Sequence, residues 1–219
     1  MEELRQKTPA MSSIARKTWN VLRHGLIVQT VLDVLLKVGI EISPFYLFEE
    51  GIFGDEFRPA APDLNDPVIS IFGPEEFGSI GRIPDHKDSE ARLLELLKAG
   101  NECYGLKTQD VIVGYTWVNP NECRYRGLCI PLGNDEAYLF NMMVVRAFRG
   151  KNAAAYLRYS CVKELERQGR TKCLSVSSYF TAPALRFKEK LGAKIIGLYL
   201  HVELFGRWGR TWTLKNYAR

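Results

Sequence analysis

A strand, a basic turn and a helix follow one another without interruption between Ala137 and Gln168, and no other stretch constrains the fold as strongly. The run Tyr138–Val145 is apolar and rich in β-forming residues, which predicts a strand. The turn Arg146–Asn152 is basic and contains a glycine, and helical periodicity begins directly after it. On that helix we expect apolar residues on one face (Tyr156, Leu157, Cys161 and Leu165) and charged residues elsewhere (Arg158, Lys163, Glu166 and Arg167).

The start of this helix is suited to bind phosphate. A helix N-terminus presents unpaired backbone N–H groups and the positive end of the helix dipole. Arg149 and Lys151 add fixed positive charge. Neither the GxxxxGK[ST] motif nor GxGxxG is present, so the turn by itself leaves open an ordinary basic connection between a strand and a helix.

The wider pattern around the turn favours a phosphate-bearing cofactor. Val144 followed by Arg149-Gly150-Lys151-Asn152-Ala153-Ala154 resembles the acetyl-coenzyme A (acetyl-CoA) loop of the GNAT superfamily of N-acetyltransferases, in which a glycine is usual in place of Asn152. The resemblance implies that the backbone of Met142 donates to the thioester carbonyl and that the backbone of Val144 holds the pantetheine. It implies cofactor contacts from Met142, Met143, Val144, Arg149, Gly150, Lys151, Asn152, Ala153 and Ala154.

A second motif of the same family is similar to residues 181–193, which read TAPALRFKEKLGA. Ala184 and Gly192 match their positions in that motif. Thr181 replaces an asparagine that often contacts the cofactor, and it is carried over as a cofactor-binding residue. Lys188 stands where the family has a tyrosine that often protonates the leaving thiolate.

The resemblance implies an α+β fold with a mixed, mostly antiparallel central sheet, helices on both faces, and a fourth and fifth strand that splay apart. The acceptor pocket would then be built from residues 51–87 and 119–135, of which the second is predicted to be a long turn region. The remaining sequence patterns predict strands at Phe45–Phe48, Val68–Phe72, Glu102–Leu106, Val111–Val118, Lys172–Ser178, Lys194–Leu204 and Arg207–Leu214, and helices from Pro74, at Asp88–Ala99 and at Pro183–Leu191.

Residues 1–43 are predicted to be an N-terminal helical extension, and residues 44–219 to be the GNAT-like domain. Thr18–Ile40 is apolar, but Arg23, Asp33 and Lys37 interrupt it and no small-residue cleavage site follows, so neither a membrane span nor a signal peptide is expected. As a helix it carries an apolar stripe with cationic flanks. That stripe could lie at a membrane surface, bind a partner, or pack on its own domain.

Charge is distributed unevenly along the 219 residues. The net charge is +3 over residues 1–39, −10 over residues 40–145 and +12 over residues 146–219. A basic C-terminal third could bind nucleic acid, but it begins at the phosphate-type turn, so a phosphate-bearing cofactor explains it more economically and no nucleic-acid partner is expected.

Cysteine and histidine usage indicates no metal site. The five cysteines are an odd number without CxxC spacing, and the three histidines are scattered. This pattern predicts reduced thiols and a cytoplasmic protein, with peripheral association at the inner face of the membrane left open.

Transfer of an acyl group to an amine needs a base, carbonyl polarisation and an acid. Lys188 is the candidate acid, either buried with a pKa near neutrality or simply facing solvent. Glu136 is the candidate base, with Asn141 and Tyr115 as alternatives acting through a water molecule. Tyr179, like Tyr138, is either a proton donor or a packed aromatic residue.

The combined patterns predict an acetyl-CoA-dependent N-acetyltransferase that acts on the amine of a small-molecule or carbohydrate-linked acceptor. Two alternatives remain. One is a long-chain N-acyltransferase fed by an acyl carrier protein or acyl-CoA. The other is a non-catalytic module that binds an acyl carrier or a membrane partner. The sequence does not indicate the acceptor or the oligomeric state.

Overall fold

The computed structural model describes residues 28, 31–51, 59, 64–84, 86 and 88–217. Within these residues the chain forms two compact units. The smaller unit holds the described residues up to Ile42 together with Val202–Arg210. The larger unit holds those of Ser43–His201 and those from Thr211 onward.

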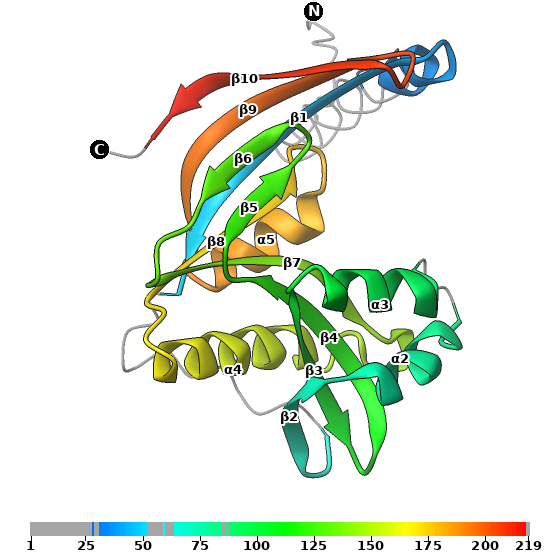
Figure 1. Ribbon diagram of the computed structural model, residues 1–219, viewed down its shortest axis with the longest axis vertical. Helices are drawn as coiled ribbons and strands as arrows, with labels where there is room; N and C mark the ends of the chain where they lie inside the picture. The colour runs from blue at the N-terminus through cyan, green and yellow to red at the C-terminus, as the bar shows by residue number, and fades with distance from the viewer. Residues whose placement is uncertain are drawn as a thin grey trace, which may run out of the picture. The chain divides into compact units, whose positions relative to one another are not determined.

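The helices and strands of the described chain are shown in Figure 1. The strands are β1 (Ile40–Glu50), β2 (Pro67–Phe72), β3 (Glu102–Thr108), β4 (Val111–Asn119), β5 (Glu122–Tyr125), β6 (Leu128–Pro131), β7 (Glu136–Val144), β8 (Lys172–Ser178), β9 (Lys194–Leu204) and β10 (Trp208–Asn216). The helices are α2 (Pro74–Gly81), α3 (Glu90–Lys98), the 3-10 helix η1 (Arg146–Phe148), α4 (Ala153–Arg167) and α5 (Ala182–Lys190).

Eight strands form one mixed sheet in the order β10-β9-β1-β8-β7-β4-β3-β2, and β5 pairs with β6 in a separate hairpin. β7 and β8 run parallel, whereas β1 with β8, β2 with β3, β3 with β4 and β4 with β7 run antiparallel. This arrangement confirms the predicted α+β fold with a mostly antiparallel sheet.

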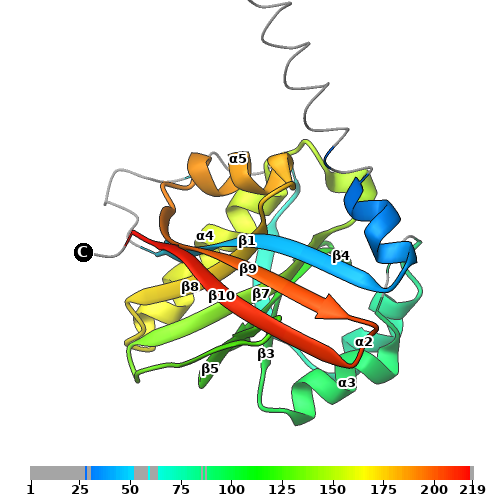
Figure 2. The ribbon, with the colours of Figure 1, turned by 90° about the horizontal axis from the view of Figure 1, so that it is seen from above.

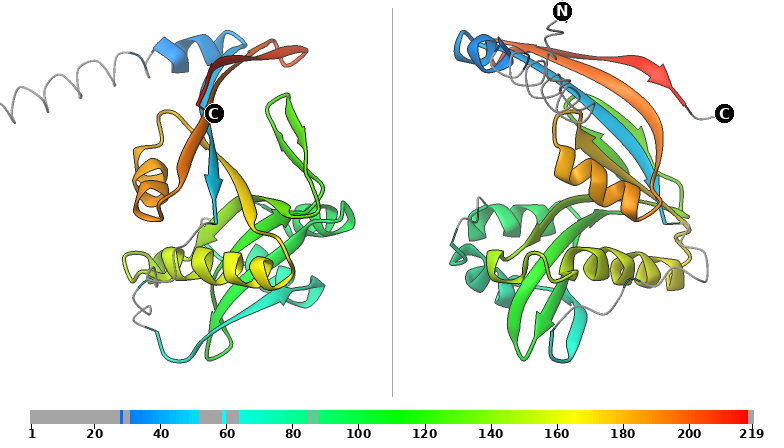
Figure 3. Two further views of the ribbon diagram at one scale, coloured as in Figure 1. Left: turned by 90° about the vertical axis from the view of Figure 1, so that its left-hand side faces the viewer. Right: turned by 180° about the vertical axis from the view of Figure 1, so that it is seen from behind.

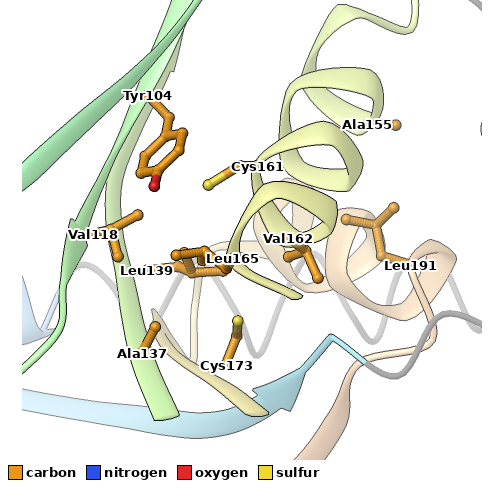
Figure 4. Close-up of a cluster of buried hydrophobic side chains, with 10 residues drawn as sticks. All are labelled: Tyr104, Val118, Ala137, Leu139, Ala155, Cys161, Val162, Leu165, Cys173 and Leu191. Carbon is orange, nitrogen blue, oxygen red and sulfur yellow. The ribbon is translucent and has the colours of Figure 1, made fainter. Parts of the chain in front are cut away.

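Helices lie on both faces of the sheet within the larger unit. Tyr104, Val118 and Leu139 pack against α4, whereas Cys103, Trp117 and Phe140, their neighbours along the same strands, pack against α2 and α3. Because successive strand residues point to opposite faces, α4 covers one face of the sheet, and α2 and α3 cover the other. Figure 2 shows α2 and α3 together, and Figure 4 shows the side chains between α4 and the strands, with Leu191 beside Val162.

The β5–β6 hairpin lies on the side of the sheet opposite α5 (Figure 3, left). Its Cys123 is fully buried and packs with Leu47, Tyr138 and Leu174. Residues 119–135 were predicted to be a long turn region, and that prediction is wrong, because Glu122–Tyr125 and Leu128–Pro131 pair as strands. Each strand is only four residues long, so its own propensity is weak and pairing with the neighbouring segment decides its conformation.

The smaller unit contains the helical residues 31–37, which are followed by a turn at Gly39. Gly39 has a φ of +84° and donates its N–H to the carbonyl of Leu36 at 3.0 Å, a glycine helix terminus. The predicted helix Thr18–Ile40 therefore ends at Lys37, and its first part lies outside the described residues. Val31, Val34 and Leu36 are each more than half exposed. Docking through this stripe stays a prediction.

No helix in the described part of the chain is both long and apolar enough to cross a bilayer.

Gly105 on β3 provides a test of packing within the sheet. A Cβ atom at this position would overlap the ring of the fully buried Phe72 on β2. We expect Gly105→Ala to lower the free energy of unfolding by about 2 kcal/mol, since overpacking a dense core typically costs about 1–3 kcal/mol. Urea denaturation measures this difference.

The matched control is Gly78→Ala on α2, where the nearest atom to an added Cβ, Oε2 of Glu90, is 3.5 Å away. That substitution should raise stability by about 0.5–1 kcal/mol, because alanine is the better helix former. Equal stability of Gly105→Ala and the parent protein would show that the sheet repacks at Phe72.

Candidate active site

A pocket of about 760 Å³ lies at the N-terminal end of α4 in the larger unit. Its walls come from the end of β7, the turn after η1, the first turn of α4, and α5. Residues from all four segments line it, among them Val144, Gly150, Asn152, Ala154, Phe187 and Lys190. The strand, basic turn and helix expected from the sequence therefore border one concave space.

The first turn of α4 offers hydrogen-bond donors to this pocket. Tyr156 donates its N–H to the carbonyl of Asn152 at 3.1 Å, but within the described residues the N–H groups of Ala153, Ala154 and Ala155 have no acceptor. These are the orphan donors of a helix start, where the dipole also favours negative charge. The arrangement can bind an anion such as a phosphate group.

Asn152, the departure from the usual glycine, preserves the backbone conformation. It is the residue that precedes α4 and has a φ of +61°. Asparagine is among the few residues other than glycine that tolerate this left-handed region. Gly150 has a φ of +80°, and no atom lies within 4 Å of where its Cβ would stand. The backbone of the turn therefore keeps the left-handed conformation that a glycine would allow at Asn152, and the space beside Gly150 is open.

Two cationic side chains, Arg149 and Lys190, line the pocket, and Lys151 belongs to the same turn. Arg149 donates from Nε to the carbonyl of Val144 at 3.0 Å, and Nζ of Lys151 lies 5.8 Å from the centre of the Phe148 ring. Nζ of Lys190 on α5 donates to Oδ1 of Asn152 at 3.4 Å, which adds a cation that the sequence patterns did not single out. The carbonyl of Val144, whose backbone is expected to hold pantetheine, thus already accepts a hydrogen bond from Arg149.

A β-bulge interrupts β7 next to the turn. On β4, Trp117 opposes Phe140 and Tyr115 opposes Met143, so two steps along β4 correspond to three steps along β7. Asn141, with a φ of +45°, lies inside this bulge. A bulged residue has no partner of its own in the ladder and bends its strand. Asn141 and Met142 therefore have no paired partner on β4 within the described strands.

The bulge also changes which side chains face α4. Met142 and Val144 pack in the cluster with Leu157 of α4, whereas Met143 packs with the α2–α3 side. Leu139, three residues before Met142, also faces α4. Strict alternation would place Leu139 and Met142 on opposite faces, so the extra residue shifts the alternation by one.

β7 and β8 part immediately before this bulge. Their parallel pairing runs from Glu136 with Lys172 to Leu139 with Ser175, and no pairs between them follow within the described strands. The structure therefore shows two neighbouring strands that separate, as the family resemblance implied for the strands on either side of the cofactor.

Lys188 of α5 lies at the point where the strands part. Its Nζ donates to Oγ of Ser175, the last residue of β8 that pairs with β7, and is 3.1 Å from Oε1 of Glu50. Its ammonium also lies 4.5 Å from the centre of the Phe48 ring. With 4% of its surface exposed, Lys188 is buried, so its interpretation as a solvent-facing helix lysine is wrong.

Glu50 joins Lys188 to a second buried cation. Nε of Arg158 on α4 is 3.5 Å from Oε2 of Glu50, and the Ser175 hydroxyl donates to Oε1. Glu50 and Arg158 are each 4% exposed. We call Glu50, Arg158, Ser175 and Lys188 the buried charge cluster.

The surroundings shift both titrating groups of the cluster. Burial lowers the pKa of Lys188 to about 8, with Arg158 repulsion acting in the same direction and Glu50 opposing it. Burial alone would raise the pKa of Glu50, but attraction to Arg158 and Lys188 outweighs it and holds that pKa below its ordinary value. Glu50 is therefore ionised at neutral pH. Lys188, with a pKa of about 8, loses its proton not far above neutral pH.

Comparison with known families decides the identity. The family model described as "Acetyltransferase (GNAT) family" matches residues 67–193, more than half of the chain. The chain is a GNAT N-acetyltransferase. No curated protein sequence matches it.

Solved structures agree with this fold. A GCN5-related N-acetyltransferase from Sphaerobacter thermophilus is 14% identical with a TM-score of 0.51, over 89% of this chain and 69% of that one. Another from Kribbella flavida is 16% identical with a TM-score of 0.51, over 78% and 62%. A Drosophila protein is 14% identical with a TM-score of 0.52, over 83% and 58%. Identities this low show the fold alone, and the chain spans less than two thirds of the last two proteins.

In this acetyltransferase Glu136 does not lie with the other candidate site residues. Its Oε1 is 2.7 Å from Nζ of Lys172, and its Oε2 accepts from the N–H of Gly133. The Lys172 contact lowers the pKa of Glu136. Glu136 is six residues before Met142 on β7, a distance of roughly 20 Å at about 3.3 Å per residue. We therefore leave Glu136 out of the proposal below.

Tyr179 and Thr181 occupy exposed positions between β8 and α5. The Tyr179 ring is 45% exposed and stacks on Tyr46 with ring centres 5.3 Å apart. Thr181 precedes α5, and its carbonyl accepts from the N–H groups of Ala184 and Leu185. Neither residue lines the pocket at α4.

The other aromatic candidates are buried on the α2–α3 side. The hydroxyl of Tyr115 is 2.5 Å from Nε2 of His86, and burial raises the pKa of Tyr115, which disfavours a phenolate base. Tyr138 stacks on Phe140 with ring centres 5.3 Å apart, and burial raises its pKa as well. Both are packed aromatics in this fold.

Sequence reasoning missed Glu50 and Arg158, although signals for both exist. Arg158 precedes Cys161 by three residues and Val162 by four, and all three are buried on α4. The prediction that Arg158 lies away from the apolar face is therefore wrong. Glu50 is two residues after Phe48, so a strand that continued past the predicted end at Phe48 would place both side chains on one face.

Proposed function

We propose that this acetyltransferase moves an acetyl group from acetyl-CoA to the amine of a small-molecule or carbohydrate-linked acceptor, with Lys188 supplying a proton to the leaving sulfur. One observation carries the proposal: the pocket at α4 combines three backbone N–H groups that have no acceptor within the described residues with two cations, Arg149 and Lys190. That set of donors is suited to a diphosphate group.

The residues at the pocket fit coenzyme A. The N–H groups of Ala153, Ala154 and Ala155 would bind the diphosphate, and Arg149 and Lys190 would neutralise its charge. Bound there, the coenzyme supplies an acetyl thioester. The backbone freed by the β7 bulge at Met142 is the candidate donor to the thioester carbonyl, because it is not held in the β4 ladder.

Acetyl transfer forms a bond between the amine nitrogen and the carbonyl carbon and breaks the bond from that carbon to sulfur. The amine loses one proton and the sulfur gains one. Nζ of Lys188 holds a proton at the site where β7 and β8 part, and a pKa near 8 makes that proton available at neutral pH.

The packing at that site favours a short acyl group over a long one. Phe48, Ser175 and Lys188 are each at most 4% exposed, and they lie where the pairing of β7 with β8 ends. A chain of eight or more carbons would have to displace these side chains. The long-chain alternative requires such a displacement, and the acetyl group does not.

The test is thiol release from acetyl-CoA, octanoyl-CoA and palmitoyl-CoA against a panel of amines, with mass spectrometry of the product. We expect turnover with acetyl-CoA and an amine, and at least tenfold less with the longer thioesters. Preference for palmitoyl-CoA would favour the long-chain alternative. Tight coenzyme binding without turnover on any amine would favour the non-catalytic module.

A further inference from the structure

The buried charge cluster contains an unequal number of charges. With Lys188 protonated it holds two cations, Arg158 and Lys188, and one anion, Glu50. When Lys188 is neutral it holds one of each. A net charge buried away from water is costly, whereas a paired one is tolerated. The neutral form of Lys188 is therefore the form in which the cluster is electrically balanced.

Arg158 keeps Glu50 partnered in both states. Its Nε remains beside Oε2 of Glu50 at 3.5 Å, while Lys188 uses the other oxygen at 3.1 Å. An arginine does not lose its proton in a protein. Lys188 is consequently the cation that can give up its charge, and Glu50 is not left unpaired when it does so.

Within the described residues no carboxylate other than Glu50 acts on Lys188, and the Phe48 ring, 4.5 Å from its Nζ, adds only a cation–π attraction. Ser175 accepts from Lys188 and donates to Glu50, and it carries no charge. The thiol of Cys123 on β5 stays neutral, because burial raises its pKa to about 12. Arg158 has two nitrogens, Nε and Nη1, that are buried without a hydrogen bond within the described residues. Buried polar groups without a hydrogen bond are unfavourable for stability, so these nitrogens need an explanation.

We infer that Glu50 and Arg158 are positioning residues for proton donation, with Glu50 fixing the ammonium of Lys188 where β7 and β8 part and Arg158 driving that ammonium to release its proton. This inference rests on the proposed role of Lys188. The proton leaves Nζ for the leaving sulfur, the cluster becomes neutral, and solvent protonates Nζ again before the next turnover.

Two substitutions should move the protonation of Lys188 in opposite directions. Arg158→Met removes the repelling cation, so Lys188 should hold its proton to higher pH. Glu50→Gln removes the attracting anion, so Lys188 should lose its proton at lower pH. The Glu50→Gln shift should be about one pH unit or more, because Glu50 lies 3.1 Å from Nζ and a charge within about 4–6 Å moves a pKa by about 1–3. The Arg158→Met shift should be measurable in the opposite direction.

The experiment measures the pH dependence of kcat at saturating acetyl-CoA. Activity should fall above about pH 8 in the parent protein as Lys188 deprotonates. This falling limb should move to higher pH in Arg158→Met and to lower pH in Glu50→Gln. Arg167→Met on the exposed side of α4 is the matched control and should leave the limb in place.

A second readout does not depend on turnover. A ¹⁵N NMR titration of lysine Nζ, with the Lys188 signal assigned by its loss in Lys188→Met, should show the same opposite shifts. Arg158→Met leaves a balanced Glu50–Lys188 pair and should fold, so it carries the test even where Glu50→Gln does not fold. Either readout overturns the inference if Arg158→Met leaves the Lys188 titration unchanged or moves it to lower pH.

Failure of the underlying function gives a different result. If Lys188→Met keeps full turnover, Lys188 is not the proton donor, and the positioning role fails with it. If Lys188→Met loses turnover but Arg158→Met does not move the limb, the donor is correct and the role of Arg158 is wrong.

Discussion

Lys188→Met should lower kcat by about a hundredfold while the KM for acetyl-CoA changes by less than about twofold. A positioned general acid typically contributes about 10²–10⁴ in rate, and a group that acts on the leaving sulfur affects the chemical step more than binding. The substitution should not leave an unpaired buried charge, because Glu50 and Arg158 remain as a balanced pair. Steady-state kinetics of thiol release measure both constants.

The pH profile provides the specific signature of this loss. Lys188 must be protonated to act as an acid, so parent activity should fall as pH rises through about 8, and Lys188→Met should lack that limb. Lys188→Tyr should recover part of the turnover, because a phenol can also donate a proton. Full activity of Lys188→Met would assign the proton to another group, with Tyr179 the next to be substituted.

Replacing both Arg149 and Lys151 with glutamate should weaken coenzyme A binding by at least tenfold, or about 1.4 kcal/mol. Both residues belong to the turn before α4, and Arg149 lines the pocket. Charge-assisted contacts to phosphate are worth about 1.5–3 kcal/mol each, and the reversal adds repulsion. Calorimetric titration at low and high salt measures the change, which should shrink as salt screens the charges.

The control for this experiment is Arg92→Glu with Lys98→Glu on α3, which changes the net charge by the same amount at exposed positions away from the pocket. Coenzyme affinity should change less than twofold in that variant. Equal weakening in both variants would mean that overall charge, not the turn, governs binding.

The turn and α4 could be predicted because their determinants are local. The β-rich run before the turn, the basic glycine-containing turn and the helical spacing after it each lie within a few residues of one another. The structure agrees, with β7 ending at Val144 and α4 starting at Ala153. Even the departure at Asn152 follows a local rule, because asparagine tolerates the left-handed φ that the turn requires.

The acid–base part of the site could not be predicted in the same way. Glu136 lies at the start of the correct strand, yet its partner Lys172 comes from β8, and that ion pair removes it from consideration. Glu50 precedes Lys188 by more than a hundred residues, and nothing in either segment indicates that they meet. The β7 bulge likewise appears only in the register of β4 against β7.

The sequence by itself determined the family-like strand, turn and helix, the mostly antiparallel α+β fold and the position of Lys188 in the second motif. These follow from periodicity, turn chemistry and short-range spacing, which act between neighbours in the chain. Only the tertiary structure decided that Lys188 is buried and paired with Glu50 and Arg158. Burial and ion pairing depend on which distant segments pack together, and those contacts set the charge and the pKa of the group that we propose carries the proton.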